Sequence, residues 1–301
     1  MSWPGKECDR ILLGMQAHSF PERGSLAPDF TTGRANHSIA AGASHTSAPR
    51  PVSIRPLIMP VEHGGWSLLL EPIVLALIIL PSAAGALVAF AAVCAFLIRQ
   101  PLNLAVQDHR RERRFPRTIV CERLVLFLAS AVVVTLLWPV LETGGGVLMP
   151  MLLASPLLGV LVAHDLRSPG RALVPEIAAA TMVGAAGAAV VLAGHGPASV
   201  AYALWAVMAC RAIPAIMHVR TSLGKSSFAA SVLVHVAAVL VTAALYRGGV
   251  LPAAAVVAML LLYGRALFAV QLRRLSAKRM GITELAMGML TVAIVAIGFL
   301  K

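Results

Sequence analysis

Long apolar stretches alternate with short polar connections from residue 65 to the end of the chain. Nine of these stretches approach the ~20 residues that an α-helix needs to cross a bilayer. They cover residues 65–81, 84–107, 119–141, 147–163, 173–193, 198–219, 227–246, 250–270 and 282–300, of which the first and fourth are the shortest. The pattern predicts an all-α, polytopic membrane bundle with about nine transmembrane helices.

The first part of the chain has a different composition from the rest. It is rich in Ser, Ala, Gly, Pro and His and shows no sustained periodicity, which is typical of disordered segments. Its apolar patch at residues 11–13 is too short for the core of a secretory signal peptide. We expect a disordered cytoplasmic tail over residues 1–58 and a transmembrane helical domain over residues 59–301.

The overall composition supports a membrane protein and excludes a soluble enzyme or a fibrous chain. Apolar residues make up 58% of the sequence and charged residues 13%, with a mean hydropathy of +0.83, whereas soluble domains are about a quarter charged. The four cysteines form no C-x-x-C pair, so neither a disulfide framework nor a cysteine metal site is indicated.

The positive charges lie in short clusters between the apolar stretches, where they orient a membrane protein rather than bind nucleic acid. The connections after the second, fourth, sixth and eighth stretches contain thirteen Lys and Arg residues, and the connections after the other four contain only Arg247. The positive-inside rule therefore predicts a cytoplasmic N-terminus and a C-terminal Lys301 on the outside. We expect a multi-pass protein of the cell (inner) membrane.

Among the charged residues inside predicted membrane helices, Glu71, Arg99 and Arg211 are the clearest. A charge at the bilayer centre costs about 2.5–3.5 kcal/mol even on the lenient insertion scale, so such residues are functional candidates. The alternative interpretation is structural. An arginine can extend toward the head groups, and an intramembrane Glu–Arg pair can hold two helices together.

Two similar segments occur at the predicted cytoplasmic ends of the second and sixth helices. Residues 99–108 and 211–220 each begin with Arg, contain Pro two or three residues later and end in a charged residue. At helical spacing Arg99, Asn103 and Gln107 form one polar stripe, and Arg211 with His218 forms another. This repeat predicts two pseudo-repeated halves and one shared polar cavity.

Other polar residues gather at the same predicted cytoplasmic rim, at the start of the first and fifth helices and before the ninth. The opposite rim has only short or Gly-rich turns, so we expect a site that faces the cytoplasm. The candidate ligand-binding residues are Glu62, His63, Glu71, Arg99, Asn103, Asp108, Glu176, Arg211, His218 and Arg220.

Several motifs resemble the YwiC-like bacterial membrane proteins. They are Pro-Val-Glu-His-Gly-Gly-Trp at 60–66 with Glu71-Pro72, Arg99-Gln-Pro with Asp108, Arg113-Arg-Phe-Pro-Arg-Thr118, and Arg211-x-x-Pro214 with His218-Val-Arg220. The resemblance covers residues 60–301, and the P-x-E-H-G-x-W opening is its most specific part. It implies a fold and a membrane location, without an activity.

The predicted architecture also resembles the UbiA-type intramembrane prenyltransferases. In that family, aspartate motifs at the ends of helices two and six hold Mg²⁺ against a prenyl diphosphate. Here Asn103, Asp108 and Glu112 form at most a partial first motif, and the second location has His218 and Arg220 in place of carboxylates. The resemblance thus implies at most one Mg²⁺, at Asp108 and Glu112, whereas the arginines suit an anionic ligand.

The leading hypothesis is a UbiA-like membrane protein with a cytoplasm-facing polar cavity for an isoprenoid or another lipid with an anionic head. Catalysis is left open. A prenyltransferase with this incomplete motif would have to assist diphosphate departure with Arg99, Arg211 and Arg220. A small transporter is the first alternative, because intramembrane charges and internal repeats are common in transporters. An assembly factor for a membrane complex is the second.

Overall fold

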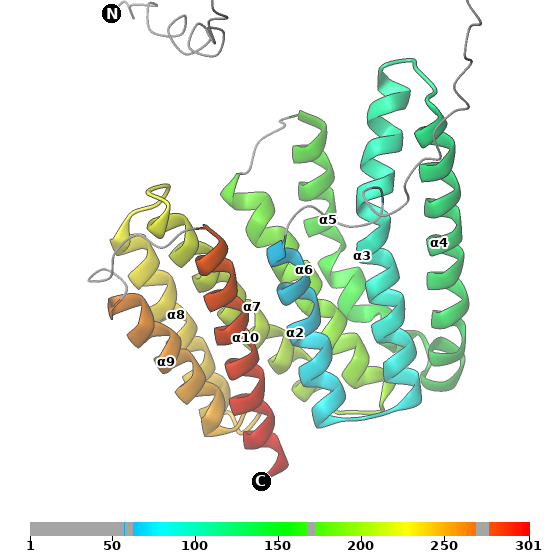
Figure 1. The fold of residues 1–301 in the computed structure, drawn as a ribbon. Helices are drawn as coiled ribbons and strands as arrows, with labels where there is room; N and C mark the ends of the chain where they lie inside the picture. Colours follow the sequence, from blue (N-terminus) through cyan, green and yellow to red (C-terminus); the bar gives the residue numbers. More distant parts are fainter. Residues whose placement is uncertain (1–56, 58–62, 168–171, 269–276) are drawn as a thin grey trace, which may run out of the picture. The chain divides into compact units, whose positions relative to one another are not determined.

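The computed structural model describes residues 57, 63–167, 172–268 and 277–301, which all lie in the unit Pro51–Lys301. These residues form nine α-helices, one short 3₁₀ helix and no strand, as the sequence predicts. The helices are α2 (His63–Ile79), α3 (Ala83–Arg110), α4 (Pro116–Thr143), η1 (Gly145–Leu148), α5 (Met149–Arg167), α6 (Leu173–Ala193), α7 (Ala198–Ser222), α8 (Phe228–Arg247), α9 (Ala253–Phe268) and α10 (Ala277–Leu300), shown in Figure 1. Except for Leu57, the predicted tail lies outside the described residues.

Seven of the described helices are long and apolar enough to cross a membrane. The protein is therefore a multi-pass membrane protein. The first helix is short, as predicted, with 17 residues in α2. The fourth is longer than predicted, because η1 continues into α5 and together they give an apolar segment of 20 residues, Gly145–His164. The other short helix is α9, whose described part has 16 residues.

The helix ends follow from local chemistry. Ser82 caps α3 by accepting a hydrogen bond from the Gly85 amide at 3.0 Å, which satisfies one of the unpaired N–H groups of the first turn. Pro116 begins α4, where its missing N–H costs nothing, and Thr118 Oγ1 accepts a hydrogen bond from the Phe115 amide at 3.1 Å. Gly144 ends α4 with a φ of 81°, a value that favours glycine.

The core is built around α6, which packs against α2, α3, α5 and α7. Its buried residues are almost all Ala, Gly and Val, and small residues let transmembrane helices approach closely. At the closest point, a Cβ on Gly187 would lie only 2.7 Å from the carbonyl oxygen of Pro72 on α2. In Figure 1 α6 lies between α3 on one side and α7 on the other.

The remaining helices complete the bundle around α2 and α7. α8 packs between α7 and α9, and α10 packs against both α2 and α9. This arrangement brings α2, α7, α9 and α10 together, although α2 and α10 lie at opposite ends of the described sequence (Figure 1).

A long hairpin is formed by α3 and α4, each of 28 residues. At 1.5 Å per residue each helix is about 42 Å long, which exceeds the ~30 Å hydrocarbon core of a bilayer. The hairpin tip carries the exposed residues Arg110, Arg111, Arg113 and Arg114. Leu57 is buried and packs against Ala105 of α3 and Cys121 of α4, so this residue contacts the hairpin.

Candidate functional site

A buried ion pair joins α2 to α7. Arg211 Nη2 donates a hydrogen bond to Glu71 Oε1 at 3.1 Å, and the Arg211 and Glu71 side chains are 2% and 4% exposed. Arg211 is the fourteenth of the 25 residues of α7, so the pair lies near the middle of a helix that is long and apolar enough to cross a membrane. Ser67, one turn before Glu71, donates its hydroxyl to the same Oε1 atom. These two residues were predicted from their depth, and the structure brings them together.

Two further charged residues extend this pair into a network. Arg211 Nη2 also donates to the main-chain oxygen of Glu284 on α10 at 2.7 Å, and Arg211 Nη1 lies 3.6 Å from Glu284 Oε2. The other carboxylate oxygen of Glu284 accepts a hydrogen bond from Arg265 Nη2 of α9. The intramembrane network is thus Glu71, Arg211, Glu284 and Arg265, with two positive and two negative charges.

Gly288 makes room for the network. This glycine of α10 is buried, and a Cβ at its position would overlap the Glu71 carboxylate and lie 2.7 Å from Arg211 Nη2. A side chain at position 288 would therefore push α10 away from the pair.

Two buried histidines lie close to the network. His218, two turns after Arg211 on α7, is 7% exposed and lies within electrostatic range of Arg265, Glu284 and His235. His235 of α8 shares a hydrogen bond between its Nδ1 and the Ser231 carbonyl at 2.7 Å. Its ring lies 6.4 Å from the ring of Tyr263 on α9. The polar interior therefore continues from the ion pairs toward α8.

Several nitrogen atoms of the arginines are buried without a hydrogen-bond acceptor among the described residues. They are Nε of Arg211, Nε of Arg220 and Nη1 of Arg265, and the buried Glu284 Oε2 likewise receives no hydrogen bond there. A buried donor or acceptor without a partner costs about 1–3 kcal/mol. Such atoms are uncommon in a stable interior, and they can bind a ligand that supplies the missing partners.

A second ion pair lies closer to the C-terminal end of α7. Arg220 Nη1 donates to Glu176 Oε2 of α6 at 3.0 Å, and the two side chains are 16% and 31% exposed. Both residues were candidates, and the structure pairs them with each other. Arg220 lies nine residues after Arg211, so both arginines belong to the same half of α7.

Asp108 has a structural partner at the base of the hairpin tip. Its fully buried carboxylate accepts hydrogen bonds from Arg117 Nη2 at 2.6 Å, Arg117 Nε at 3.1 Å and Thr118 Oγ1 at 2.8 Å. Arg117 in turn lies over the Phe115 ring, 5.1 Å from its centroid. Both oxygens of Asp108 are therefore engaged in joining α3 to α4.

The proposed partial metal motif is not assembled in the described part of the chain. Glu112 is exposed in the turn between α3 and α4 with a φ of 52°. Among the described residues, no group of three or more His, Cys, Asp or Glu side chains is placed to hold a metal ion. The residues present thus do not fit the Mg²⁺ ion that the UbiA resemblance implied.

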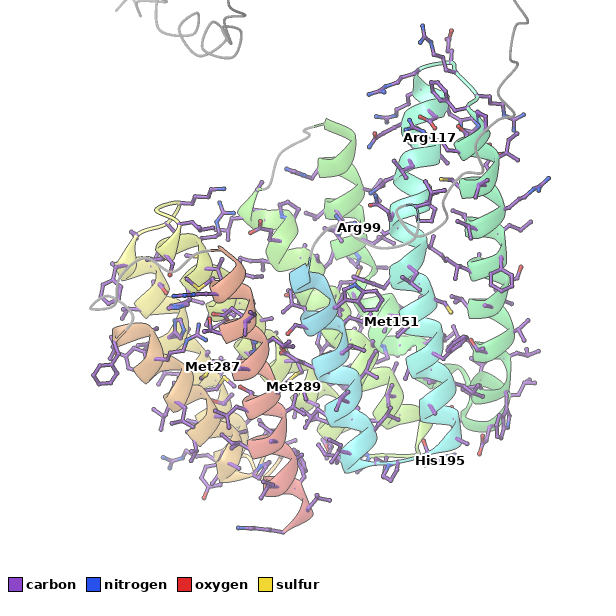
Figure 2. All side chains as sticks on the ribbon, viewed as in Figure 1. Arg99, Arg117, Met151, His195, Met287 and Met289 are labelled. Carbon is purple, nitrogen blue, oxygen red and sulfur yellow. The ribbon has the colours of Figure 1, made fainter. Side chains whose placement is uncertain are left out.

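Arg99 and Arg211 occupy different environments, although their sequences look alike. Arg99 is exposed on α3, and Figure 2 shows it part-way along that helix, well below Arg117 at the hairpin tip. Asn103, one turn further, is partly buried. Since α6 lies between α3 and α7, the structure does not bring the two polar stripes together.

Two other candidates cannot be placed in the network. Glu62 lies outside the described residues, and His63 is described only as the first residue of α2.

At the opposite end of the bundle, where Figure 2 shows His195, the His195 and Glu142 side chains form an exposed ion pair with 3.9 Å between Nε2 and Oε1.

Sequence reasoning missed Arg265 and placed Glu284 at the rim. Arg265 lies inside the eighth predicted span and meets the same criterion that selected Arg211. Glu284 is the eighth residue of α10, about two turns inside the helix, because α10 begins earlier than the apolar stretch. Gly288 has no signal in a single sequence that distinguishes it from other glycines of membrane helices.

The fold and the buried charges define a multi-pass helical membrane protein with an intramembrane ion-pair network. Residues 59–192 match the model of the family described as YwiC-like protein, so the resemblance predicted from the motifs is confirmed over this stretch. It runs from the segment before α2 almost to the end of α6, and the motif around Arg211 lies beyond it. No curated protein and no solved structure matches the chain.

Proposed function

We propose that the protein binds an amphipathic molecule with an anionic head group, at the arginines of α7 and α9 on the predicted cytoplasmic side. The observation that carries this proposal is a set of buried N–H donors on Arg211, Arg220 and Arg265 that have no acceptor among the described residues. An isoprenoid or another lipid with a phosphate or carboxylate head supplies several acceptor oxygens at once. Arginine pairs with such groups through parallel, charge-assisted hydrogen bonds.

The exposures of the side chains indicate the side from which a head group reaches the network. Arg265 is 22% exposed, Glu284 14% and Arg211 2%. The network is therefore open at α9 and α10 and closed at α7. A head group would meet Arg265 first and would then compete with Glu284 for Arg211.

The network has no net charge before a ligand binds, since Arg211 and Arg265 balance Glu71 and Glu284. Binding then depends on hydrogen bonds to the unused donors more than on long-range attraction. This balance fits a lipid, which is already concentrated in the bilayer and needs no electrostatic steering to reach the site.

The proposal includes a relationship to the UbiA-type proteins at the level of architecture and of an amphipathic ligand with an anionic head group. The supports are the nine α-helices that the described residues form and a polar region at the predicted cytoplasmic side. The proposal is for binding and not for metal-assisted prenyl transfer, because both oxygens of Asp108 are engaged by Arg117 and Thr118.

The test is lipid retention. Wild-type protein purified in mild detergent should carry about one anionic-headed lipid per chain in native mass spectrometry. Arg265→Met should lose it, whereas Arg247→Met, an exposed arginine at the end of α8, should keep it. Thermal unfolding of each variant controls for misfolding. A wild-type protein without bound lipid, or equal retention in the folded Arg265→Met variant, would overturn the proposal.

A transporter is the second candidate, and one observation favours it. Arg211 is shared between Glu71 of α2 and Glu284 of α10, and exchange of an arginine between two carboxylates is a way to couple ion or proton binding to helix movement. Reconstituted protein should then move a labelled solute or protons across a vesicle membrane, and Arg211→Met should stop it. A protein that retains lipid and moves neither would leave binding as its function.

A further inference from the structure

Glu284 places one unused acceptor among the arginine donors of the intramembrane network. Its Oε1 accepts a hydrogen bond from Arg265. Its Oε2 is buried and receives no hydrogen bond from the described residues, because the nearest arginine nitrogen, Arg211 Nη1, is 3.6 Å away. Arg211 instead directs its Nη2 to the main-chain oxygen of Glu284.

The buried atoms of the network that have no hydrogen-bond partner among the described residues therefore include both donors and an acceptor. Arg211 Nε and Arg265 Nη1 are donors, and Glu284 Oε2 is an acceptor that carries negative charge. A head group that has only anionic oxygens would satisfy the donors but would meet the Glu284 carboxylate with like charge. A head group that is only cationic would satisfy Glu284 and leave both donors unpaired.

We infer that the head group bound here carries both an anionic oxygen and a hydrogen-bond donor, such as a phosphodiester with a neighbouring hydroxyl or ammonium group. The anionic oxygens accept from Arg265 Nη1 and Arg211 Nε, and the hydroxyl or ammonium donates to Glu284 Oε2. This inference rests on the proposed function and narrows its ligand class. It disfavours both a diphosphate without a donor and a quaternary ammonium head.

The site can select for a head group with both features because the groups that bind them lie on different helices. The donors belong to α7 and α9 and the acceptor to α10, and Glu284 is held in place by Arg265 through its other oxygen. The acceptor is therefore fixed in position before a ligand arrives, which lowers the cost of ordering the site on binding.

The experiment compares two lipids that have the same acyl chains and the same charge. Phosphatidylglycerol has a glycerol head with hydroxyl donors, and phosphatidylmethanol has none. Delipidated wild-type protein should retain phosphatidylglycerol about tenfold more strongly in native mass spectrometry, the factor that corresponds to one hydrogen bond to a charged group. This comparison uses the wild-type chain and does not depend on whether a variant folds.

Glu284→Gln tests the residue itself. The amide keeps an oxygen for Arg265 and replaces the second oxygen with an NH₂ group, which cannot accept a hydrogen bond, so the preference between the two lipids should disappear. Glu142→Gln changes an exposed carboxylate at the opposite end of the bundle and should keep the tenfold preference.

The outcomes separate the two proposals. Equal retention of both lipids by the wild type would overturn the inference and leave the proposed function intact. Retention of neither lipid would overturn both. Displacement of bound phosphatidylglycerol by an equal concentration of soluble glycerol phosphate would support the donor-and-anion chemistry and would contradict a lipid as its source. An unchanged preference in folded Glu284→Gln would overturn the role of Glu284.

Discussion

Gly288 of α10 lies directly against the carboxylate of Glu71 on α2. α10 can cover the Glu71–Arg211 ion pair only because position 288 has no side chain, since a Cβ there would overlap Glu71 and come within 2.7 Å of Arg211 Nη2. The pair is thereby covered by a helix that lies more than two hundred residues after Glu71 in the sequence.

Gly288→Ala should lower the free energy of unfolding by about 1–3 kcal/mol, the usual cost of overpacking a filled interior. Gly281→Ala in the same helix is the matched control, because its Cβ would meet nothing within 4 Å. Since Ala favours a helix over Gly by up to about 1 kcal/mol, the control should be as stable as the wild type or more so. Equal melting temperatures for the two variants would contradict the close contact.

Arg211→Met should destabilise the protein by about 3–5 kcal/mol, because it leaves the buried Glu71 carboxylate without its counter-ion. Thermal unfolding in detergent measures this change. The double variant Glu71→Leu with Arg211→Met should recover most of the loss, because no charge is then left unpaired.

Arg99→Met serves as the comparison for Arg211→Met. Arg99 is exposed, whereas Arg211 is 2% exposed, so we expect Arg99→Met to lower the stability less than Arg211→Met. A similar loss of stability in the Arg99 and Arg211 variants would show that burial does not distinguish them.

Asp108→Asn should loosen the tip of the α3–α4 hairpin without unfolding the bundle. The change removes the charge that Arg117 pairs with at 2.6 and 3.1 Å, so hydrogen exchange should become faster in residues 109–118. Arg117→Met should have the same effect, and the double variant should add little to either single variant. Additive effects would show that the two residues act separately.

Leu57→Ala should expose Cys121. Leu57 is 7% exposed and packs against Cys121, which is fully buried. Replacing a buried Leu with Ala costs about 2–5 kcal/mol, and here the cost falls on a local contact. Maleimide labelling of Cys121, located by mass spectrometry, should become faster, while labelling of Cys94 should not change. Unchanged labelling at Cys121 would show that Leu57 does not cover it.

The orientation of the chain is a prediction of the loop charges. A reporter fused after Lys301 should be active outside the membrane, and a reporter inserted between Arg111 and Arg114 should be active in the cytoplasm. Activity of both reporters on the same side of the membrane would mean that an even number of crossings separates the two sites. That result would contradict the predicted topology.

The helices were predictable because a membrane span has a simple requirement, a run of apolar residues of sufficient length. The ends of the helices were less predictable. The fourth span was predicted short because the glycines at 144–146 look like the end of a helix, whereas η1 uses Gly145 and Gly146 within a 3₁₀ turn.

The sequence was enough to predict several residues of the candidate site, but it did not predict which of them form ion pairs. Glu71 and Arg211 stood out by their depth, but a single sequence gives no distance between residues that are 140 positions apart. Asp108 was interpreted as a metal ligand from a motif, whereas Arg117, nine residues later, satisfies its carboxylate. Glu284 appeared to lie at the rim because the predicted apolar stretch begins at residue 282, only two residues before it, whereas α10 begins at Ala277.

The sequence separation of 140 residues between Glu71 and Arg211 also has a consequence for biosynthesis. At about 5–20 residues per second, the ribosome needs roughly 7–28 seconds to make Arg211 after Glu71 has been made. During this time α2, with only 17 residues, has a carboxyl group and no counter-ion. Stable insertion of the first helix therefore depends on the arrival of the sixth, and a chain that stops before α7 should leave α2 poorly anchored in the membrane.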